Sequence, residues 1–262
     1  MPQKTLALVT GASSGIGYHL ARICAEAGHD LLVAADDADI HDAAESFRRE
    51  GQRVDAVEVD LSTIEGVDEL LEELEGRRVG LLFANAGRGL GHGFLDQDFG
   101  KIRHVMDTNM LGTLYLLHRV VGQMRQARQG RVLITGSIAG FTPGAYQAVY
   151  NASKAFLDNF SFALRHEVKE HGITVTCLMP GATETEFFDT AQLRDTAIGQ
   201  SRKDDPADVA RAGYDAMMRG DGDIVTGWMN KLQSAIANIT PAQWLAAGHA
   251  RAAAPGSGKK PA

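Results

Sequence analysis

The chain is short of positive charge and of long apolar runs, and each shortage excludes a class of partner. Its formal net charge is −7 at pH 7, so its electrostatics give no reason to expect nucleic acid or an anionic membrane. No apolar run approaches the roughly 18 to 20 residues that a membrane-spanning helix needs. The first residues also lack the apolar stretch of a signal peptide. We therefore expect neither a nucleic-acid nor a membrane partner.

Cysteine is also scarce, with two residues in the whole chain. Cys24 falls in a predicted helix and Cys177 in a predicted strand, and their spacing does not suit metal ligands. Cysteines of this kind are typical of small, reduced core residues. We therefore expect a cytoplasmic protein without a metal site.

What the chain does contain is a regular alternation of strand-like and helical segments. The predicted strands cover residues 5–10, 30–34, 54–59, 80–84, 131–135, 174–179 and 223–226. The predicted helices cover residues 15–27, 40–50, 64–75, 101–128, 147–171 and 206–218. Several strands are continuously apolar, which is typical of parallel strands covered by helices on both faces. The alternation predicts an α/β fold, a Rossmann-type doubly wound parallel sheet of about seven strands with helices on both faces.

Neither an internal repeat nor a linker divides this alternation. We therefore expect one domain over residues 1–250. Residues 251–262 are rich in alanine, proline, glycine, serine and lysine, and this composition predicts a disordered tail.

A glycine-rich loop stands where the first predicted strand meets the first predicted helix. Gly11, Gly15 and Gly17 allow a tight turn and bring the backbone close to a diphosphate. The N–H groups and the dipole at the helix start then favour the anion. A loop of this kind is a weak signal alone, but its position between an apolar strand and an amphipathic helix predicts dinucleotide binding.

Tyr150 and Lys154 are separated by four residues in a predicted helix. That spacing places both side chains on one face, roughly 5–6 Å apart at Cβ. An ammonium group beside a phenol favours the phenolate and lowers its pKa towards the range useful for proton transfer. The pair is therefore a candidate for acid–base chemistry, although a chance pairing on a helix face has the same appearance.

Further motifs occur in order along the chain: Asp60-Leu61, Asn85-Ala86-Gly87, Asn109 followed by Gly112, Ser137 thirteen residues before Tyr150, and Pro180-Gly181 followed by Thr183 and Thr185. Together with the loop at 10–17 and the Tyr150–Lys154 pair, they resemble the short-chain dehydrogenase/reductase (SDR) family over nearly the whole chain. The resemblance implies an oxidoreductase that transfers a hydride between a nicotinamide cofactor and an alcohol or carbonyl substrate. The domain over 1–250 would then bind the dinucleotide and carry the catalytic residues.

The resemblance also implies roles for particular residues. The catalytic residues would be Asn109, Ser137, Tyr150 and Lys154. Tyr150 would act as general acid and base, Lys154 would lower its pKa and bind the nicotinamide ribose, and Ser137 would hold the reacting oxygen. Asn109 would kink its helix and hold a water that links Lys154 to solvent, and Thr185 would bind the carboxamide. The cofactor-binding residues would be Gly11, Ser13, Ser14, Gly15, Ile16, Gly17, Asp36, Asp60, Leu61, Asn85, Ala86, Gly87, Tyr150, Lys154, Pro180, Gly181, Thr183 and Thr185.

The end of the second predicted strand bears on the choice of cofactor. An acid there accepts hydrogen bonds from a free ribose 2′-hydroxyl and repels a 2′-phosphate. Asp36 is such an acid, and no arginine occurs in residues 30–43, which favours NAD(H) over NADP(H). However, Ala35 stands where the NAD enzymes of the family carry their aspartate, so Asp36 can also point into solvent.

The segment 186–205 stands where the family has a mobile substrate loop. Phe187, Phe188, Leu193 and Ile198 favour a small-molecule substrate with an apolar flank, unless they pack onto the sheet. Two other functions stay open: a catalytically inactive NAD(P)-sensing binding protein, and a carrier-linked 3-oxoacyl reductase. The second needs a basic landing surface for its acidic carrier. The candidate residues for that surface are Arg119, Arg125, Arg128 and Arg131, which a solvated helix face explains equally well.

The long predicted helices at 101–128 and 147–171 resemble the pair that forms the subunit interface in this family. The resemblance therefore implies a homodimer or a homotetramer.

Overall fold

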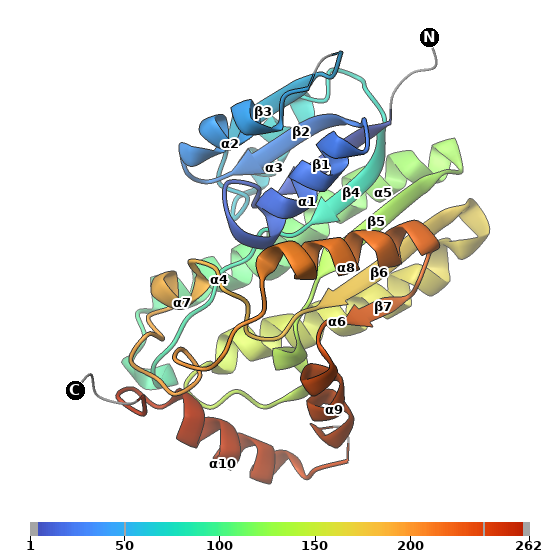
Figure 1. Ribbon diagram of the computed structural model, residues 1–262. Coiled ribbons are helices and arrows are strands. Elements are labelled where there is room, and N and C mark those ends of the chain that lie inside the picture. Colours follow the sequence, from blue (N-terminus) through green and yellow to red (C-terminus); the bar gives the residue numbers. More distant parts are fainter. Residues whose placement is uncertain (1–4, 50, 238, 259–262) are drawn as a thin grey trace.

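The computed structural model describes residues 5–49, 51–237 and 239–258, and its centre is one parallel sheet (Figure 1). The seven strands run in the order β3-β2-β1-β4-β5-β6-β7, and every neighbouring pair is parallel. Their bounds are β1 Leu6–Thr10, β2 Asp30–Ala35, β3 Val54–Glu58, β4 Val79–Ala84, β5 Gly130–Thr135, β6 Ile173–Met179 and β7 Asp223–Val225. The Rossmann-type sheet expected from the sequence is confirmed.

The sheet grows outward from β1 in both directions. The strands β2 and β3 lie on one side of β1, and β4 to β7 lie on the other. The crossovers on the two sides therefore diverge at the carboxyl end of β1. This switch point, between β1 and β4, is where a doubly wound sheet leaves a crevice for a ligand.

Helices cover both faces of the sheet. Two buried clusters, one on each face, contain residues of α1, α2 and α8 in one case and of α3, α5 and α6 in the other. Figure 1 shows α1 and α8 in front of the sheet and α5 behind it. The bounds of these helices are α1 Gly15–Glu26, α2 Asp39–Phe47, α3 Ile64–Glu72, α5 Thr113–Ala127, α6 Ala148–Val168 and α8 Pro206–Arg219.

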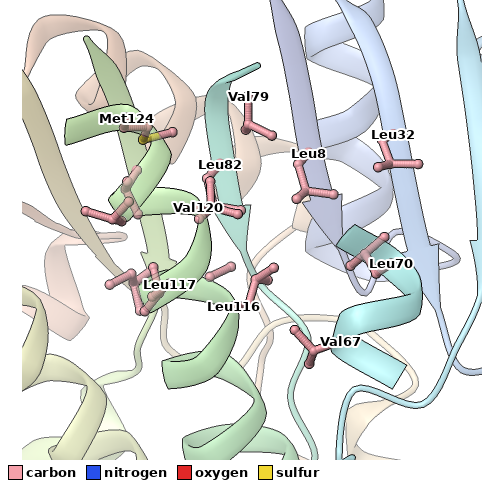
Figure 2. Close-up of a cluster of buried hydrophobic side chains, with 14 of the residues drawn as sticks. Leu8, Leu32, Val67, Leu70, Val79, Leu82, Leu116, Leu117, Val120 and Met124 are labelled. Atoms are coloured by element: carbon pink, nitrogen blue, oxygen red, sulfur yellow. The ribbon is translucent and has the colours of Figure 1, made fainter. Parts of the chain in front are cut away.

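The core behind the sheet is a layer of aliphatic side chains. Leu116, Leu117 and Val120 on α5 face Leu82 on β4 (Figure 2), and all four are at most 2% exposed. Each strand alternates its side chains between the two faces, so Leu8 joins this cluster and its neighbour Val9 joins the opposite one. Burial on both faces explains why the strand sequences are continuously apolar.

The predicted helix at 101–128 is interrupted. The structure has α4 over Phe99–Met106, a π-helical segment η2 over Asp107–Gly112, and then α5. A Cβ at Gly112 would lie 1.8 Å from the carbonyl oxygen of Leu61, so the helix passes hard against the loop after β3. A π turn of this kind changes the direction of a helix and is frequent at functional sites, and it contains Asn109.

The remaining elements lie mostly around the carboxyl edge of the sheet. They are η1 Phe94–Asp96, η3 Ile138–Phe141, η4 Lys169–His171, α7 Phe187–Thr190, α9 Trp228–Ala237 and α10 Ala242–Ala253. Within the described ranges, no helix is both long enough and apolar enough to span a bilayer.

The C-terminal segment differs from the disordered tail expected over 251–262. Residues 251–253 form the end of α10, and the backbone N–H groups of Gly256 and Gly258 donate to Asp195, at 2.7 Å to its carboxylate and 2.9 Å to its carbonyl oxygen. These contacts with a distant loop order a segment whose composition alone predicts disorder. Residues 259–262 lie outside the described part of the chain.

The core layer predicts how one substitution affects stability. Leu82→Ala should lower the free energy of unfolding by about 2–5 kcal/mol, because Leu82 is 0% exposed and its loss leaves a cavity. Leu95→Ala is the matched control, since Leu95 is 92% exposed and its truncation should change stability by less than about 0.5 kcal/mol. Urea denaturation of the two variants measures the difference, and equal effects would contradict this assignment of the core.

Candidate active site

A cavity of about 1270 Å³ lies over the carboxyl ends of the strands. It is lined by the glycine-rich loop, the ends of β2 to β6, α6, and the C-terminal helices α9 and α10. Every residue that the sequence assigned to the cofactor or to catalysis lines this cavity except two. Gly17 and Asn109, the exceptions, are buried and support its wall.

The glycine-rich loop forms the floor of the cavity next to β1. A Cβ at position 17 would lie 1.9 Å from the carbonyl oxygen of Gly11, so the first turn of α1 packs directly against the loop. Gly15 has φ +56°, a conformation that glycine adopts without steric cost. The open N-terminus of α1 therefore faces the cavity with its free N–H groups, as anion binding requires.

Asn85 ties three strands together at this edge. Its amide nitrogen donates to the carbonyl oxygens of Thr10 and Gly11, at 3.1 and 3.2 Å, and its side-chain oxygen accepts from the hydroxyl of Thr135 at 3.0 Å. The backbone N–H groups of Asn85 and Ala86 donate to the Thr10 hydroxyl. Asn85 thus holds the glycine-rich loop at a fixed distance from β4 and β5.

Acidic residues surround the part of the cavity beside the ends of β2 and β3. Asp36, Asp37 and Asp60 all line it. The hydroxyl of Ser13 donates to the Asp37 carboxylate at 2.9 Å. Asp36 forms an ion pair with Arg88, which follows β4. Asp36 therefore lines the cavity while staying partly exposed, and an arginine reaches this place from a part of the sequence where none was expected.

Helix α6 presents Tyr150 and Lys154 to the opposite end of the cavity. The Nζ atom of Lys154 lies 5.9 Å from the centre of the Tyr150 ring and donates to the carbonyl oxygen of Thr135 at 2.7 Å. Lys154 is 5% exposed, so its long side chain is held in place. The same-face arrangement expected from the spacing is present.

Ser137 lies at the end of β5, beside the tyrosine. Its hydroxyl donates to the carbonyl oxygen of Pro180 at 3.3 Å and accepts from the N–H of Ala139 at 3.1 Å. A side-chain hydrogen bond between Ser137 and Tyr150 lowers the pKa of the phenol. The structure thus brings together the three residues that the sequence placed on β5 and α6.

Burial shifts the pKa values of the ionisable groups at the tyrosine end of the cavity. Desolvation raises the pKa of Tyr150 to about 12, and the hydrogen bond with Ser137 opposes this rise. Desolvation lowers the pKa of Lys154 to about 8, and the nearby carboxylate of Asp158 opposes it. The lowered phenol pKa expected from the Tyr150–Lys154 pair is therefore not found, because burial of the phenol outweighs the effect of its neighbours.

Asn109 occupies the π turn and is fully buried. Its side-chain oxygen accepts from the backbone N–H of Arg88 at 2.7 Å, and its side-chain nitrogen donates to the Arg88 carbonyl oxygen and to the Ser153 hydroxyl, each at 2.9 Å. The irregular helix implied by the resemblance is present. The amide joins the loop after β4 to α6, and the role of Asn109 in holding a water stays a prediction.

Asp158 is a buried acid that the sequence analysis missed. It follows Lys154 by four residues, so it continues the face of α6 that carries Tyr150 and Lys154. Its carboxylate accepts from the backbone N–H of Ser137 at 3.3 Å and contacts the thiol of Cys177 at 3.5 Å. Desolvation raises its pKa to about 6. The helical spacing could have revealed its position, but only the fold shows its contact with Ser137.

The two phenylalanines of the predicted substrate loop have different environments. Phe188 is 8% exposed and packs with Ala191 and Leu193. Phe187 lies against the Tyr150 ring, with 4.9 Å between ring centres. Phe188 therefore packs within its own loop rather than onto the sheet, and both phenylalanines line the cavity, Phe187 beside the tyrosine.

The C-terminal helices add an apolar wall that the sequence did not predict. Trp228, Met229 and Ile236 of α9 and Trp244 of α10 line the cavity, and all four are at least 50% exposed. They lie far from Tyr150 in the sequence, and only the chain path brings them to the same edge.

A doubly wound sheet with a glycine-rich loop at its switch point, open on a deep cavity, defines a nucleotide-binding protein of the Rossmann type. The family model described as short chain dehydrogenase matches residues 5–195. The chain therefore belongs to the short-chain dehydrogenase family of oxidoreductases, as the resemblance implied.

Individual relatives agree with this membership. An uncharacterized oxidoreductase of Myxococcus xanthus is 30% identical, over 90% of this chain and 92% of that protein. A short-chain dehydrogenase of Sphingobium yanoikuyae in complex with NADPH has 27% identity and a TM-score of 0.80, over 90% of this chain and 96% of its own. A bulky-bulky ketone specific alcohol dehydrogenase of Comamonas testosteroni has 27% identity and a TM-score of 0.75, over 90% of this chain and 93% of its own.

The raised pKa of Asp158 predicts a pH-dependent effect of Asp158→Asn. Because the pKa of about 6 in the folded protein exceeds the ordinary value of 3.8, the folded protein binds this proton more tightly than the unfolded chain does. That stabilisation is present below pH ~4 and is lost as the pH rises to ~6. The variant lacks the titration, so its stability relative to the parent should increase over this range, by at most about 3 kcal/mol.

Denaturation of both proteins at pH 4, 5, 6 and 7 measures this difference. Asp42→Asn, on the exposed surface of α2, controls for the loss of one carboxylate. A difference between Asp158→Asn and the parent that does not change with pH would contradict the assignment.

Proposed function

We propose that the protein transfers a hydride between a nicotinamide cofactor and an alcohol or carbonyl substrate, with Tyr150 as general acid and base. The observation that carries this proposal is that one cavity is lined both by the glycine-rich loop and by Ser137, Tyr150 and Lys154. Family membership and the NADPH-bound relative support it. The close packing at Gly17 and the open N-terminus of α1 fit the diphosphate of such a cofactor.

The bound nicotinamide would supply or accept the hydride. The side chains of this chain would handle the proton and the geometry. Tyr150, with a pKa of about 12, is protonated at neutral pH and ready to donate to a carbonyl oxygen in the reductive direction. Ser137 would hold the same oxygen beside the phenol. Lys154, with a pKa of about 8, is mostly a cation at pH 7 and would favour the phenolate that forms.

For the cofactor, we propose that NAD(H) is favoured over NADP(H). Asp36 lines the cavity at the end of β2, where a carboxylate can accept from a free ribose 2′-hydroxyl and repels a 2′-phosphate.

For the substrate, we propose a small molecule with a bulky apolar flank. Phe187 beside Tyr150 and the exposed Trp228, Met229 and Trp244 offer an apolar surface on one side of the reacting group. The ketone specificity in the name of the Comamonas testosteroni relative agrees with this class.

The two alternative functions have weaker support. An inactive NAD(P)-sensing protein has no need of the complete set of Asn109, Ser137, Tyr150 and Lys154. A carrier-linked reductase needs several free basic groups, but three of the four candidates have partners: Arg119 pairs with Asp68, and Arg128 and Arg131 donate to backbone carbonyls. Among the described residues this leaves Arg125 alone of the four for an acidic carrier.

We also propose a cytoplasmic homodimer or homotetramer. The buried, unpaired Cys24 and Cys177 agree with a reducing compartment. Phe99, Leu111 and Phe162 leave apolar side chains exposed on α4, η2 and α6, the region where the resemblance implies a subunit interface.

The proposal predicts that Tyr150→Phe loses turnover and keeps cofactor binding. Loss of a general acid should lower kcat by roughly 10²–10⁴-fold, while NADH or NADPH affinity, measured by fluorescence titration, should change less than about threefold. Tyr115→Phe is the matched control, because its hydroxyl bonds to Asp68 on the surface. Full turnover by Tyr150→Phe would refute the mechanism, and a parent that binds cofactor without turning over any carbonyl in a wide panel would favour the sensor.

The apolar flank predicts a substrate-dependent effect of Phe187→Ala. The KM for a bulky apolar ketone should rise by roughly tenfold, because an apolar contact surface is lost. The KM for a small polar carbonyl should change less than about threefold. Phe94→Ala, at an exposed site outside the cavity, is the control. Equal effects on both substrates would show that Phe187 positions Tyr150 and does not contact the substrate flank.

A further inference from the structure

Arg88 reaches across the mouth of the cofactor cavity. Its backbone follows Gly87 at the end of β4, and its side chain forms an ion pair with Asp36 at the end of β2. The two strands flank β1, so their ends are about 10 Å apart. The side chain therefore crosses the groove directly above the beginning of the glycine-rich loop.

Two hydrogen bonds hold the backbone of Arg88 in place. The side-chain amide of Asn109 accepts from the N–H of Arg88 at 2.7 Å and donates to its carbonyl oxygen at 2.9 Å. The side chain of Arg88 extends from this anchored backbone and is 38% exposed.

The charges around Arg88 are mostly negative. Asp37, Asp39 and Asp60 line the cavity near Asp36. Among the described residues, Asp36 alone of these four acids forms an ion pair. A ligand that brings two further negative charges to this end would meet four carboxylates and the guanidinium of Arg88.

The ion pair leaves part of Asp36 available. Arg88 contacts Oδ2 of Asp36, and the described residues offer no hydrogen bond to Oδ1. A ribose 2′-hydroxyl can donate to Oδ1 while the ion pair stays in place. A 2′-phosphate cannot bind there in the same way, because Asp36 repels a second anion unless a cation lies between the two. A guanidinium binds phosphate through two parallel hydrogen bonds and is suited to that place.

We infer that Arg88 is the residue that determines how well this cavity accepts a 2′-phosphate. With Arg88, the site binds NADP(H) in spite of Asp36, because the guanidinium turns from the carboxylate to the phosphate. Without Arg88, the unneutralised Asp36 restricts the site to NAD(H). This inference rests on the proposed function, since it requires a nicotinamide dinucleotide in the cavity.

Equilibrium binding of NADH and NADPH tests the inference without turnover. Dissociation constants for both would be measured by nicotinamide fluorescence for the parent, Arg88→Gln and Asp36→Asn. Arg48→Gln is the matched control, because Arg48 is also paired with an acid, Glu45, but lies outside the cavity. Thermal unfolding would establish that each variant is folded.

Arg88→Gln should weaken NADPH binding by about tenfold or more, the effect of one charge-assisted contact, and change NADH binding less than about threefold. Asp36→Asn should strengthen NADPH binding and leave Arg88 to bind the phosphate. Equal weakening of NADH and NADPH binding by Arg88→Gln would overturn the inference, because Arg88 would then bind a part of the dinucleotide that the two cofactors share. No effect on either would overturn it as well. If the parent binds neither cofactor, the proposed function itself fails.

Discussion

The hydrogen bonds around Thr10 and Asn85 are the constraint on which the rest of the site depends. In the sheet, β1 is the strand from which both halves diverge, so its carboxyl end opens on a crevice. The Thr10 hydroxyl and the Asn85 amide join that end to β4, and Thr135 extends the connection to β5. The glycine-rich loop and the tyrosine end of the cavity are therefore held in one frame by direct bonds between strand ends.

The π turn at Asn109 connects these bonded strand ends to the helices. Its buried amide holds the backbone of Arg88 on one side and the hydroxyl of Ser153 on the other. A regular helix would not accommodate the extra residue of a π turn, and Gly112 is needed where the helix passes the loop after β3. Asn109 thus supports α6, which carries the acid–base pair, and anchors Arg88, which reaches the opposite end of the cavity.

Burial gives the catalytic end its chemical character. One face of α6 carries Tyr150, Lys154 and Asp158, and burial shifts each pKa in the direction that disfavours charge. Such groups oppose folding unless neighbours satisfy them. Here the carbonyl oxygen of Thr135 and the N–H of Ser137 do so. Clusters of shifted ionisable groups in a cavity are typical of active sites.

The sequence by itself determined the order of strands and helices, the glycine-rich loop and the spacing of Tyr150 and Lys154, because these depend on local periodicity and on short-range geometry. It also identified the family, since several short motifs occur in a fixed order. Only the tertiary structure decided that Arg88 meets Asp36, that Asp158 meets Ser137, and that α9 and α10 line the cavity. Those contacts join residues tens of positions apart or depend on side-chain direction at the sheet edge, and no local pattern encodes them.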